Sequence, residues 1–470
     1  MSGIVMLVVF FVLMLGLSAI YSRGVRGKEG FLVANRELGL WQTAFSIAAT
    51  WTWAPALFVS AQMAYDKGFS GLFWFLVPNV LCLIVFSEFA VRLRDRMPYG
   101  YTLPQYMGLR HSGRVQSLYL VQMIGLSTCA FAVQLLAGGM IFSMITGLPF
   151  LPVTLAMSAI ALSYSLWAGI KSSVVTDHLQ AIIIFVVGLI FIPWAVFEAG
   201  GPGLIIEGLG GVSGDYGNLF GAGGLEVFLS FGLATTIGLM SGPFGDQSFW
   251  QRAHAAKRSV VRRSFVIGAF IFGAIPLLMS LLGFLGAGMQ MPTDDSQMIN
   301  LDVVRQVLPA WTVIPFAFML MSGLISTLDS CLCAVSSMAG ADFERWGTVG
   351  FARFGMVLVA LAAVAIANVP GMEIIYLFLF YGTLRASTLL PTVITLLQDG
   401  HIPEAAVFYG IIGSIAVGLP IFAYGNFGDH TLWIVVGSLL TVLISGTVIM
   451  VAGKIVRGRI ERGAYAVADS

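Results

Sequence analysis

The middle of one long apolar run, from Trp311 to Met338, reads Gly323-Leu324-Ile325-Ser326-Thr327-Leu328-Asp329-Ser330. Hydroxyls buried away from water need hydrogen-bond partners, and a lone one usually bonds the carbonyl one turn earlier. Here Gly323 precedes Ser326 and Thr327 by three and four residues, so its carbonyl and both hydroxyls can converge on one point of a helix. Three uncharged oxygens suit a hard cation, provided that another segment faces them.

The composition around this run is that of an integral membrane protein. Of 470 residues, 58% are hydrophobic and 10% are charged, and the mean hydropathy is +0.91, which excludes an ordinary soluble protein. We predict an all-α protein with about thirteen spanning helices. They lie at residues 3–21, 40–64, 71–91, 115–146, 151–168, 176–197, 223–245, 264–287, 311–338, 349–368, 373–397, 404–423 and 431–453.

Basic residues are unevenly distributed between the predicted loops. All but three of the 24 lysines and arginines fall in alternate loops, at 22–39, 92–114, 171, 252–263, 345–353 and 454–462. The exceptions are Lys67, Arg305 and Arg385. Because basic loops stay in the cytoplasm, we predict an inner or plasma membrane protein with its N-terminus outside and its C-terminus in the cytoplasm. A net charge of +1 gives no reason to expect a nucleic-acid partner.

The first segment and the cysteines have simple interpretations. No basic residue precedes segment 3–21, so we expect a retained helix rather than a cleaved signal peptide. All four cysteines, including Cys331 and Cys333, lie in apolar spans. Residues two apart on a helix point in different directions, so this pair is expected to pack rather than to bind a metal.

Two predicted spans contain helix breakers at mid-membrane depth. The second has Trp51-Thr52-Trp53-Ala54-Pro55, and the seventh has Ser241-Gly242-Pro243-Phe244-Gly245-Asp246. Proline removes a backbone donor and clashes with the preceding turn, so each span should unwind there. Ordinary proline kinks are one explanation. The other is that the freed backbone groups line a cavity or a bound ligand.

The spacing of the two breaks favours a transporter. They lie five spans apart, so they occupy equivalent positions in two five-helix halves of opposite orientation. Secondary transporters built from inverted repeats have this layout, with substrate and ion sites between broken helices near the midplane.

Four stretches carry a resemblance to a known family. Residues 325–330 (ISTLDS) through Asp342 resemble the signature helix of the sodium:solute symporter family, and residues 167–180 (WAGIKSSVVTDHLQ) are similar to its Thr-Asp-x-x-Gln entry to the sixth span. Residues 246–252 (DQSFWQR) and 51–54 (WTWA) resemble the urea active transporter branch. The resemblance covers residues 3–453.

The resemblance implies a LeuT-type fold of two inverted five-helix repeats. It places a leading helix and cytoplasmic loop at 1–39, the repeats at 40–198 and 199–400, and two trailing helices with a short tail at 401–470. It also implies a sodium site, with sodium as the co-transported ion. The implied ligands are two carbonyls of the broken helix and a carbonyl and two hydroxyls opposite: Ala49, Thr52, Gly323, Ser326 and Thr327.

Two acids are candidates for the ion path. Asp177 matches a family aspartate on the cytoplasmic side of the ion site and is expected either to assist sodium release or to be a solvated acid at a helix N-terminus. Asp329 lies two residues beyond the hydroxyl pair, on another face of the helix. It could stabilise the cation, take up a proton or pair with a basic group.

Substrate contacts are expected from the unwound segments and the eleventh span. Arg385 is a charge inside a span, for which we favour a partner such as Asp329 or Glu226, with a substrate carboxylate as the alternative. The urea-branch motifs suggest a small neutral amide instead. The candidates for substrate binding are Trp51, Trp53, Asp246, Gln247, Tyr381 and Arg385.

The sequence therefore predicts a sodium-coupled symporter that imports a small polar solute, a urea-like amide or a small carboxylate, by alternating access. Its expected partners are the solute, sodium and the lipid bilayer, with no obligatory protein partner. One alternative is proton coupling through Asp329 or Asp177, and another is a membrane sensor module. An enzyme is not expected, because the chain has no metal-ligand cluster, nucleophile triad or phosphate loop.

Overall fold

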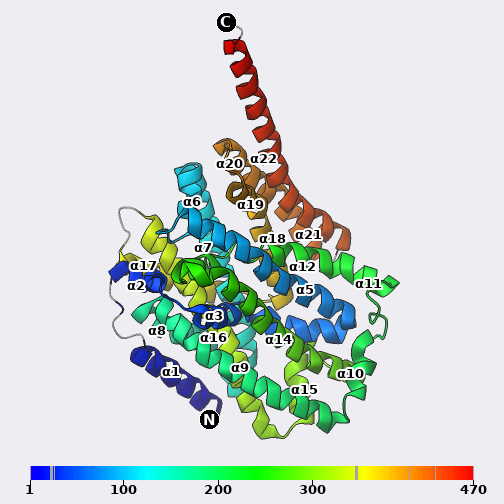
Figure 1. The fold of residues 1–470 in the computed structure, drawn as a ribbon. Helices are drawn as coiled ribbons and strands as arrows, with labels where there is room; N and C mark the ends of the chain where they lie inside the picture. The colour runs from blue at the N-terminus through cyan, green and yellow to red at the C-terminus, as the bar shows by residue number, and fades with distance from the viewer. Residues whose placement is uncertain are drawn as a thin grey trace.

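The computed structural model describes residues 2–21, 25, 27–343, 348–400, 402–428 and 430–468, without the side chains of residues 2, 3, 6, 21 and 456–468. Within these residues the chain is helical and forms no strand (Figure 1). One isolated bridge joins Leu38 to Ala256 and ties the start of the broken second span to the segment after the seventh. The prediction of an all-α membrane protein is confirmed.

The helices of the first half begin and end close to the predicted positions. They are α1 (Ser2–Tyr21), α2 (Gly27–Val33), α3 (Leu40–Trp51), α4 (Ala54–Leu57), α5 (Val59–Arg96), α6 (Leu103–Arg110), α7 (Gly113–Thr146), α8 (Phe150–Ala168), α9 (Ile170–Ala199), α10 (Gly203–Glu207) and α11 (Ala222–Val227). Within α5, Lys67 and Gly68 leave helical geometry, and Gly68 has φ +54. This kink separates the end of the second span from the third.

The second half continues the pattern. Its helices are α12 (Leu233–Met240), α13 (Gln247–Ala255), α14 (Val261–Gly288), α15 (Ile299–Val307), α16 (Val313–Asp342), α17 (Val349–Ala367), α18 (Ile374–Ala386), α19 (Leu389–Leu397), α20 (Glu404–Gly413), α21 (Leu419–Phe427) and α22 (Thr431–Ala468). A π-helical turn, Phe228–Gly232, joins α11 to α12, and a second, Ser414–Gly418, joins α20 to α21.

Eleven helices of the described chain are long and apolar enough to cross a membrane. The two other predicted spans are not among these eleven. α1 spans Ser2–Tyr21, but its side chains are described continuously only over residues 7–20, and the span at 40–64 is divided by its break into α3, α4 and the start of α5. The number thirteen therefore stays a prediction. The orientation of the chain in the membrane also stays a prediction. Some of the basic residues on which it depends lie outside the described chain, at 22–24, 26 and 344–347.

The helix that carries Ser326 and Thr327 lies at the centre of the bundle. α16 is almost wholly buried and packs against α7, α9, α17, α8 and α3, while α14 packs against α5 and α3. Trailing helices α20 and α21 pack mainly on α22, which extends beyond the rest of the bundle (Figure 1). Each polar residue at the centre of α16 therefore faces other helices, not lipid.

Candidate functional site

The second span is broken where the sequence predicts. α3 ends at Trp51, Thr52 has ψ 67 and Trp53 is extended, so α4 begins only at Ala54. The backbone amide of Ala54 donates to Oε1 of Gln134 on α7 at 2.6 Å, which pairs a donor freed by the break. Gln134 is a residue that sequence reasoning missed.

The seventh span breaks in the same way. α12 ends at Met240, and Gly242 donates its amide to Leu239 rather than to Gly238. The carbonyl of Gly238 therefore lacks its helical partner. A side chain at Gly242 would overlap the Trp51 ring, so the two breaks are in direct contact.

The predicted sodium ligands are partly brought together. A Cβ on Gly323 would lie 2.9 Å from the Thr52 carbonyl oxygen, so glycine allows α16 to approach the break. The Thr327 hydroxyl donates to the carbonyls of Thr50, at 3.2 Å, and of Gly323, at 3.3 Å. Ala49 is buried one turn before Thr52, whose amide it accepts at 3.0 Å. Thr52, Gly323 and Thr327 thus face one another, with Thr50 as an unpredicted carbonyl.

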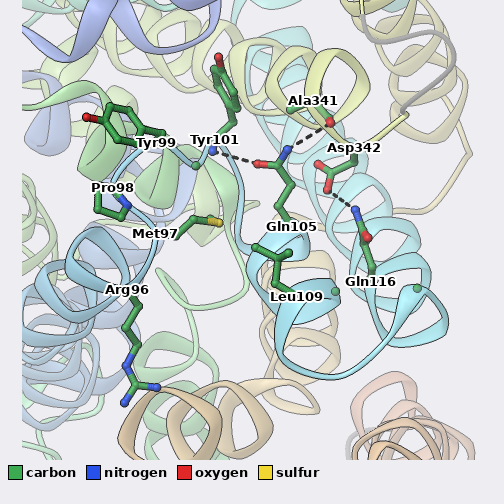
Figure 2. A pocket seen from close by; sticks show the side chains of 13 residues that line it. Arg96, Met97, Pro98, Tyr99, Tyr101, Gln105, Leu109, Gln116, Ala341 and Asp342 are labelled. Carbon is green, nitrogen blue, oxygen red and sulfur yellow. Dashed lines mark hydrogen bonds between the residues drawn. The ribbon is translucent and has the colours of Figure 1, made fainter. Parts of the chain in front are cut away.

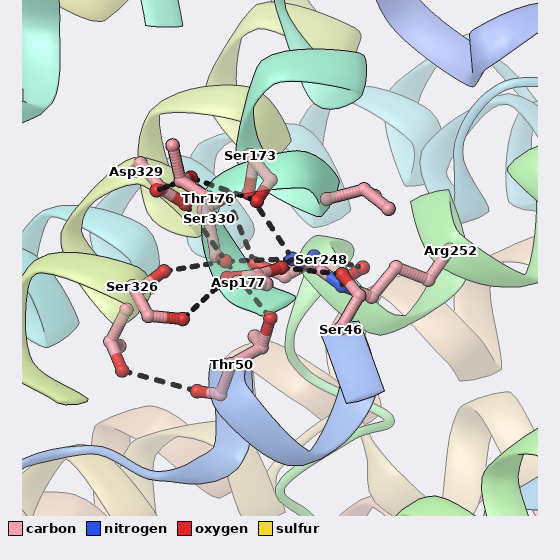
Figure 3. A network of polar contacts seen from close by, with 12 residues as sticks. Ser46, Thr50, Ser173, Thr176, Asp177, Ser248, Arg252, Ser326, Asp329 and Ser330 are labelled. Carbon is pink, nitrogen blue, oxygen red and sulfur yellow. Dashed lines mark hydrogen bonds and ion pairs between the residues drawn. The ribbon is translucent and has the colours of Figure 1, made fainter. Parts of the chain in front are cut away.

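Ser326 is directed elsewhere. Its hydroxyl donates to Oδ1 of Asp177 at 2.5 Å, and Ser46 donates to Oδ2 of the same carboxylate, also at 2.5 Å (Figure 3). Asp177 has no exposed surface, so it is not a solvated acid. It lies beside the hydroxyl pair, as the ion-path hypothesis requires.

The cation in this network is Arg252, which sequence reasoning placed in a cytoplasmic loop. Its guanidinium is fully buried and forms an ion pair with Asp177, Nη2 to Oδ2, at 3.2 Å. Nε donates to Ser46 at 2.9 Å, and Nη2 also donates to Ser330 at 2.8 Å (Figure 3). The sequence signal that could have identified Arg252 is its position as the last residue of the DQSFWQR motif. Burial, with Arg94 and Arg36 nearby, lowers the pKa of His254 on the same helix well below its usual value, so His254 is neutral.

Asp329 forms the other half of the network. Tyr164 and Ser173 donate to its two oxygens, each at 2.6 Å, and Thr176 donates to Oδ2 at 3.3 Å. Arg252 reaches Ser173 at 3.4 Å but forms no ion pair with Asp329. Two fully buried carboxylates thus surround one guanidinium. When both are ionised, the network lacks one positive charge.

Arg385 lies in a separate cluster formed by the two breaks. Its guanidinium carbon lies 4.4 Å from the ring centroid of Tyr381 and 5.6 Å from those of Trp51 and Trp53. Nε donates at 2.8 Å to the carbonyl that the second break frees on Gly238. Four of the predicted substrate residues therefore form one group, the aromatic cluster: Trp51, Trp53, Tyr381 and Arg385.

The favoured partners for Arg385 were wrong. Asp329 is bonded by hydroxyls of α8 and α9, and Glu226 faces Lys67 at 3.5 Å on an exposed surface. α18 instead directs Arg385 toward the break between α12 and α13, where Gly245 leaves space for its Cβ. Nη1 and Nη2 have no hydrogen-bond partner among the described residues.

The side chains of the two remaining substrate candidates form hydrogen bonds with backbone groups. Asp246 caps α13 by accepting the amide of Ser248 at 2.8 Å. Gln247 accepts from the amide of Leu103 at 3.1 Å and donates to the carbonyl of Tyr101 at 3.0 Å. The Gln247 side chain is therefore engaged by the backbone, and Asp246 lies near Arg385 without a bond to it.

A cavity of about 760 Å³ lies at the far end of α16, away from the aromatic cluster (Figure 2). Asp342 forms part of its wall and accepts from Thr102 at 2.8 Å and from Gln116 at 3.0 Å. Gln105 donates to the carbonyl of Ala341 at 3.2 Å. Side chains of α6 and α7 thus fasten the end of the central helix beside this cavity.

The chain is similar in sequence to known transporters. Probable urea active transporter 1 of Schizosaccharomyces pombe is 26% identical over 333 residues, which cover 67% of this chain and 49% of that protein. Urea-proton symporter DUR3 of Oryza sativa subsp. japonica is 21% identical over 483 residues, which cover 89% and 65%. The match thus spans half to two thirds of these relatives.

A solved structure shares the fold, and a family model covers most of the chain. A Na⁺-coupled sialic acid symporter in a substrate-bound, outward-open state superposes with a TM-score of 0.76 at 13% identity, covering 96% of this chain and 98% of that one. Residues 31–413 match the model of the sodium:solute symporter family, whose members are transporters and not enzymes. The chain is therefore a multi-pass membrane protein that belongs to the sodium:solute symporter family.

Proposed function

We propose that this chain is a sodium-coupled symporter that imports a small polar solute by alternating access. The observation that carries the proposal is the network in which the buried Asp177 and Asp329 face a single guanidinium, that of Arg252, beside the break in the second span. An uncompensated buried charge is costly, so this network favours a cation next to it. Carbonyls freed by the break and the Thr327 hydroxyl supply uncharged oxygens for that cation.

The proposed sodium ligands are Ala49, Thr52, Gly323, Ser326 and Thr327, with Thr50 as a further candidate. Sodium would join α16 to the broken span and so favour the state that binds solute at the aromatic cluster. Coupling requires only that the ion bind one conformation more tightly than the other. Each sodium that crosses about 100 mV supplies about 2.3 kcal/mol.

The proposal includes the orientation of the chain in the membrane and its division into two repeats. We place the N-terminus outside and the C-terminus in the cytoplasm, with inverted repeats at 40–198 and 199–400. Contact between the two breaks supports the repeats, because equivalent helices of such halves meet at the substrate site. The cavity beside Asp342 then lies on the cytoplasmic side.

Proton coupling is the second candidate function. The observation in its favour is again the paired carboxylates, since a shared proton would also remove the excess negative charge. A urea-proton symporter among the relatives shows that such coupling occurs in similar proteins. Uptake in proteoliposomes with sodium replaced by choline at fixed pH separates the two. Sodium coupling predicts that accumulation of the solute is lost, and proton coupling predicts that accumulation is unchanged.

Thr327→Ala tests the proposed ion site. Removing one oxygen ligand should raise the sodium concentration for half-maximal uptake about tenfold, equivalent to about 1.4 kcal/mol. Thr128→Ala is the matched control, because the Thr128 hydroxyl bonds only the carbonyl of Ile124 in its own helix, at 2.8 Å. Unchanged sodium dependence in Thr327→Ala would remove this site from the mechanism.

A further inference from the structure

The guanidinium of Arg385 has hydrogen-bonding capacity that the protein does not use. The side chain has no exposed surface, and only Nε has an acceptor, the carbonyl of Gly238. Among the described residues no group accepts from Nη1 or Nη2. A buried charge without a partner is costly, and within membrane spans such charges usually serve a substrate or ion pathway.

The neighbouring acids are engaged elsewhere. Asp246 accepts the amide of Ser248 at 2.8 Å, Asp177 pairs with Arg252, and Asp329 is bonded by three hydroxyls. None of them forms an ion pair with Arg385 in the described chain. Asp246 is the nearest acid but does not bond Nη1 or Nη2, so acceptors for these two nitrogens are left to a bound molecule.

The unpaired groups around Arg385 are mainly donors. The indole N–H groups of Trp51 and Trp53 are also buried without acceptors among the described residues, and both rings lie 5.6 Å from the guanidinium. A carboxylate has only acceptors and binds a guanidinium through two parallel hydrogen bonds. Urea and simple amides bring N–H groups that would need acceptors of their own. The buried hydroxyls of Thr235 and Thr383 can donate or accept, so they do not discriminate.

We infer that the transported solute is a small monocarboxylate, whose carboxylate binds Nη1 and Nη2 of Arg385 while its apolar part packs on the Trp51, Trp53 and Tyr381 rings. This inference rests on the proposed function, because it names the solute class for the same symport site. The three rings enclose the guanidinium closely, which favours small acids over extended ones.

The test uses the purified full chain and pairs of probes that differ in charge but little in shape. Acetate is compared with acetamide, and pyruvate, lactate and urea complete the panel. Binding is measured in detergent as the shift of the thermal unfolding midpoint, and transport as sodium-driven uptake into proteoliposomes. We expect acetate or another carboxylate to be preferred over the neutral probes by at least about tenfold.

Arg385→Gln should abolish the carboxylate-induced shift and the uptake, and Arg385→Lys should retain part of both, since a lysine keeps the charge but not the paired geometry. Arg305→Gln, at an exposed arginine of α15, is the control and should behave as the parent chain. Size-exclusion profiles report whether each variant folds.

The outcomes separate the two proposals. Preference for acetamide or urea, or no shift with any carboxylate, overturns the inference, and so does a carboxylate shift that survives in Arg385→Gln. Sodium-driven uptake of a neutral solute would leave the proposed function standing while the inference fails. Carboxylate binding through Arg385 without sodium-dependent uptake would support the inference and contradict the sodium-coupled function.

Discussion

Arg252 and Arg385 are both fully buried arginines in a membrane bundle, yet their surroundings differ. Arg252 pairs with Asp177 and bonds Ser46 and Ser330, so each of its guanidinium nitrogens has an acceptor. Arg385 bonds one carbonyl through Nε and is otherwise surrounded by aromatic rings. The donors of Arg252 are all paired within the protein, whereas Nη1 and Nη2 of Arg385 have no acceptor among the described residues.

The difference separates structural from ligand-binding charges. Removing one partner of a buried pair leaves an uncompensated charge, whereas removing a charge whose terminal nitrogens lack acceptors relieves a cost. One substitution made at both arginines should therefore change stability in opposite directions.

Arg252→Gln should have the largest effect. It leaves Asp177 buried without its cation, which should destabilise the protein by about 3–5 kcal/mol. Thermal unfolding in detergent measures the loss. The double variant Arg252→Gln with Asp177→Asn should recover a large part of it, since no lone carboxylate then remains at this position. A single variant as stable as the parent chain would show that the pair is not structural.

Ser46→Ala should leave Arg252, like Arg385, with a guanidinium nitrogen that has no acceptor. The Ser46 hydroxyl donates to Asp177 and accepts from Nε of Arg252, so its removal leaves unpaired atoms on both. We expect a loss of about 1–3 kcal/mol, read from the unfolding midpoint. Ser117→Ala on α7, where an exposed hydroxyl bonds its own helix, is the matched control and should change little. Equal midpoints for the two variants would contradict the bridging role.

Arg385→Gln should have the smallest effect on stability, and in the opposite direction. Loss of the unpaired Nη1 and Nη2 donors should leave the unliganded protein as stable as before, or more stable by about 1 kcal/mol. The unfolding midpoint without solute measures this directly. A loss as large as that of Arg252→Gln would mean that Arg385 has a structural role, and the contrast between the two arginines would fail.

Residue patterns predicted the architecture well because membrane constraints are local. Hydropathy alone located the spans, since lipid excludes unpaired backbone and charge from any segment that crosses it. Proline and glycine located both breaks, at Thr52–Trp53 and beyond Met240. The motif around Ser326 and Thr327 also placed the polar centre on the correct helix.

Pairing between distant residues was less predictable. The position of Arg252 after an apolar span predicts a loop charge, and only packing buries it against α3, α9 and α16. Gln134 gave no local signal, since its role depends on an amide 80 residues away. The charge of Arg385 stands out within its span, but its partners, the Gly238 carbonyl and three aromatic rings, come from other segments.

The sequence by itself determined the membrane class, the broken spans, the polar stretch on α16 and the family, because composition, helix breakers and motif spacing act within one segment. Only the tertiary structure decided which polar groups meet. It turned Ser326 toward Asp177, placed Thr327 on the Thr50 carbonyl and gave Arg385 three rings in place of an acid. The physical reason is that the partners of a buried charge come from neighbouring helices. Which helices are its neighbours depends on packing across the whole bundle.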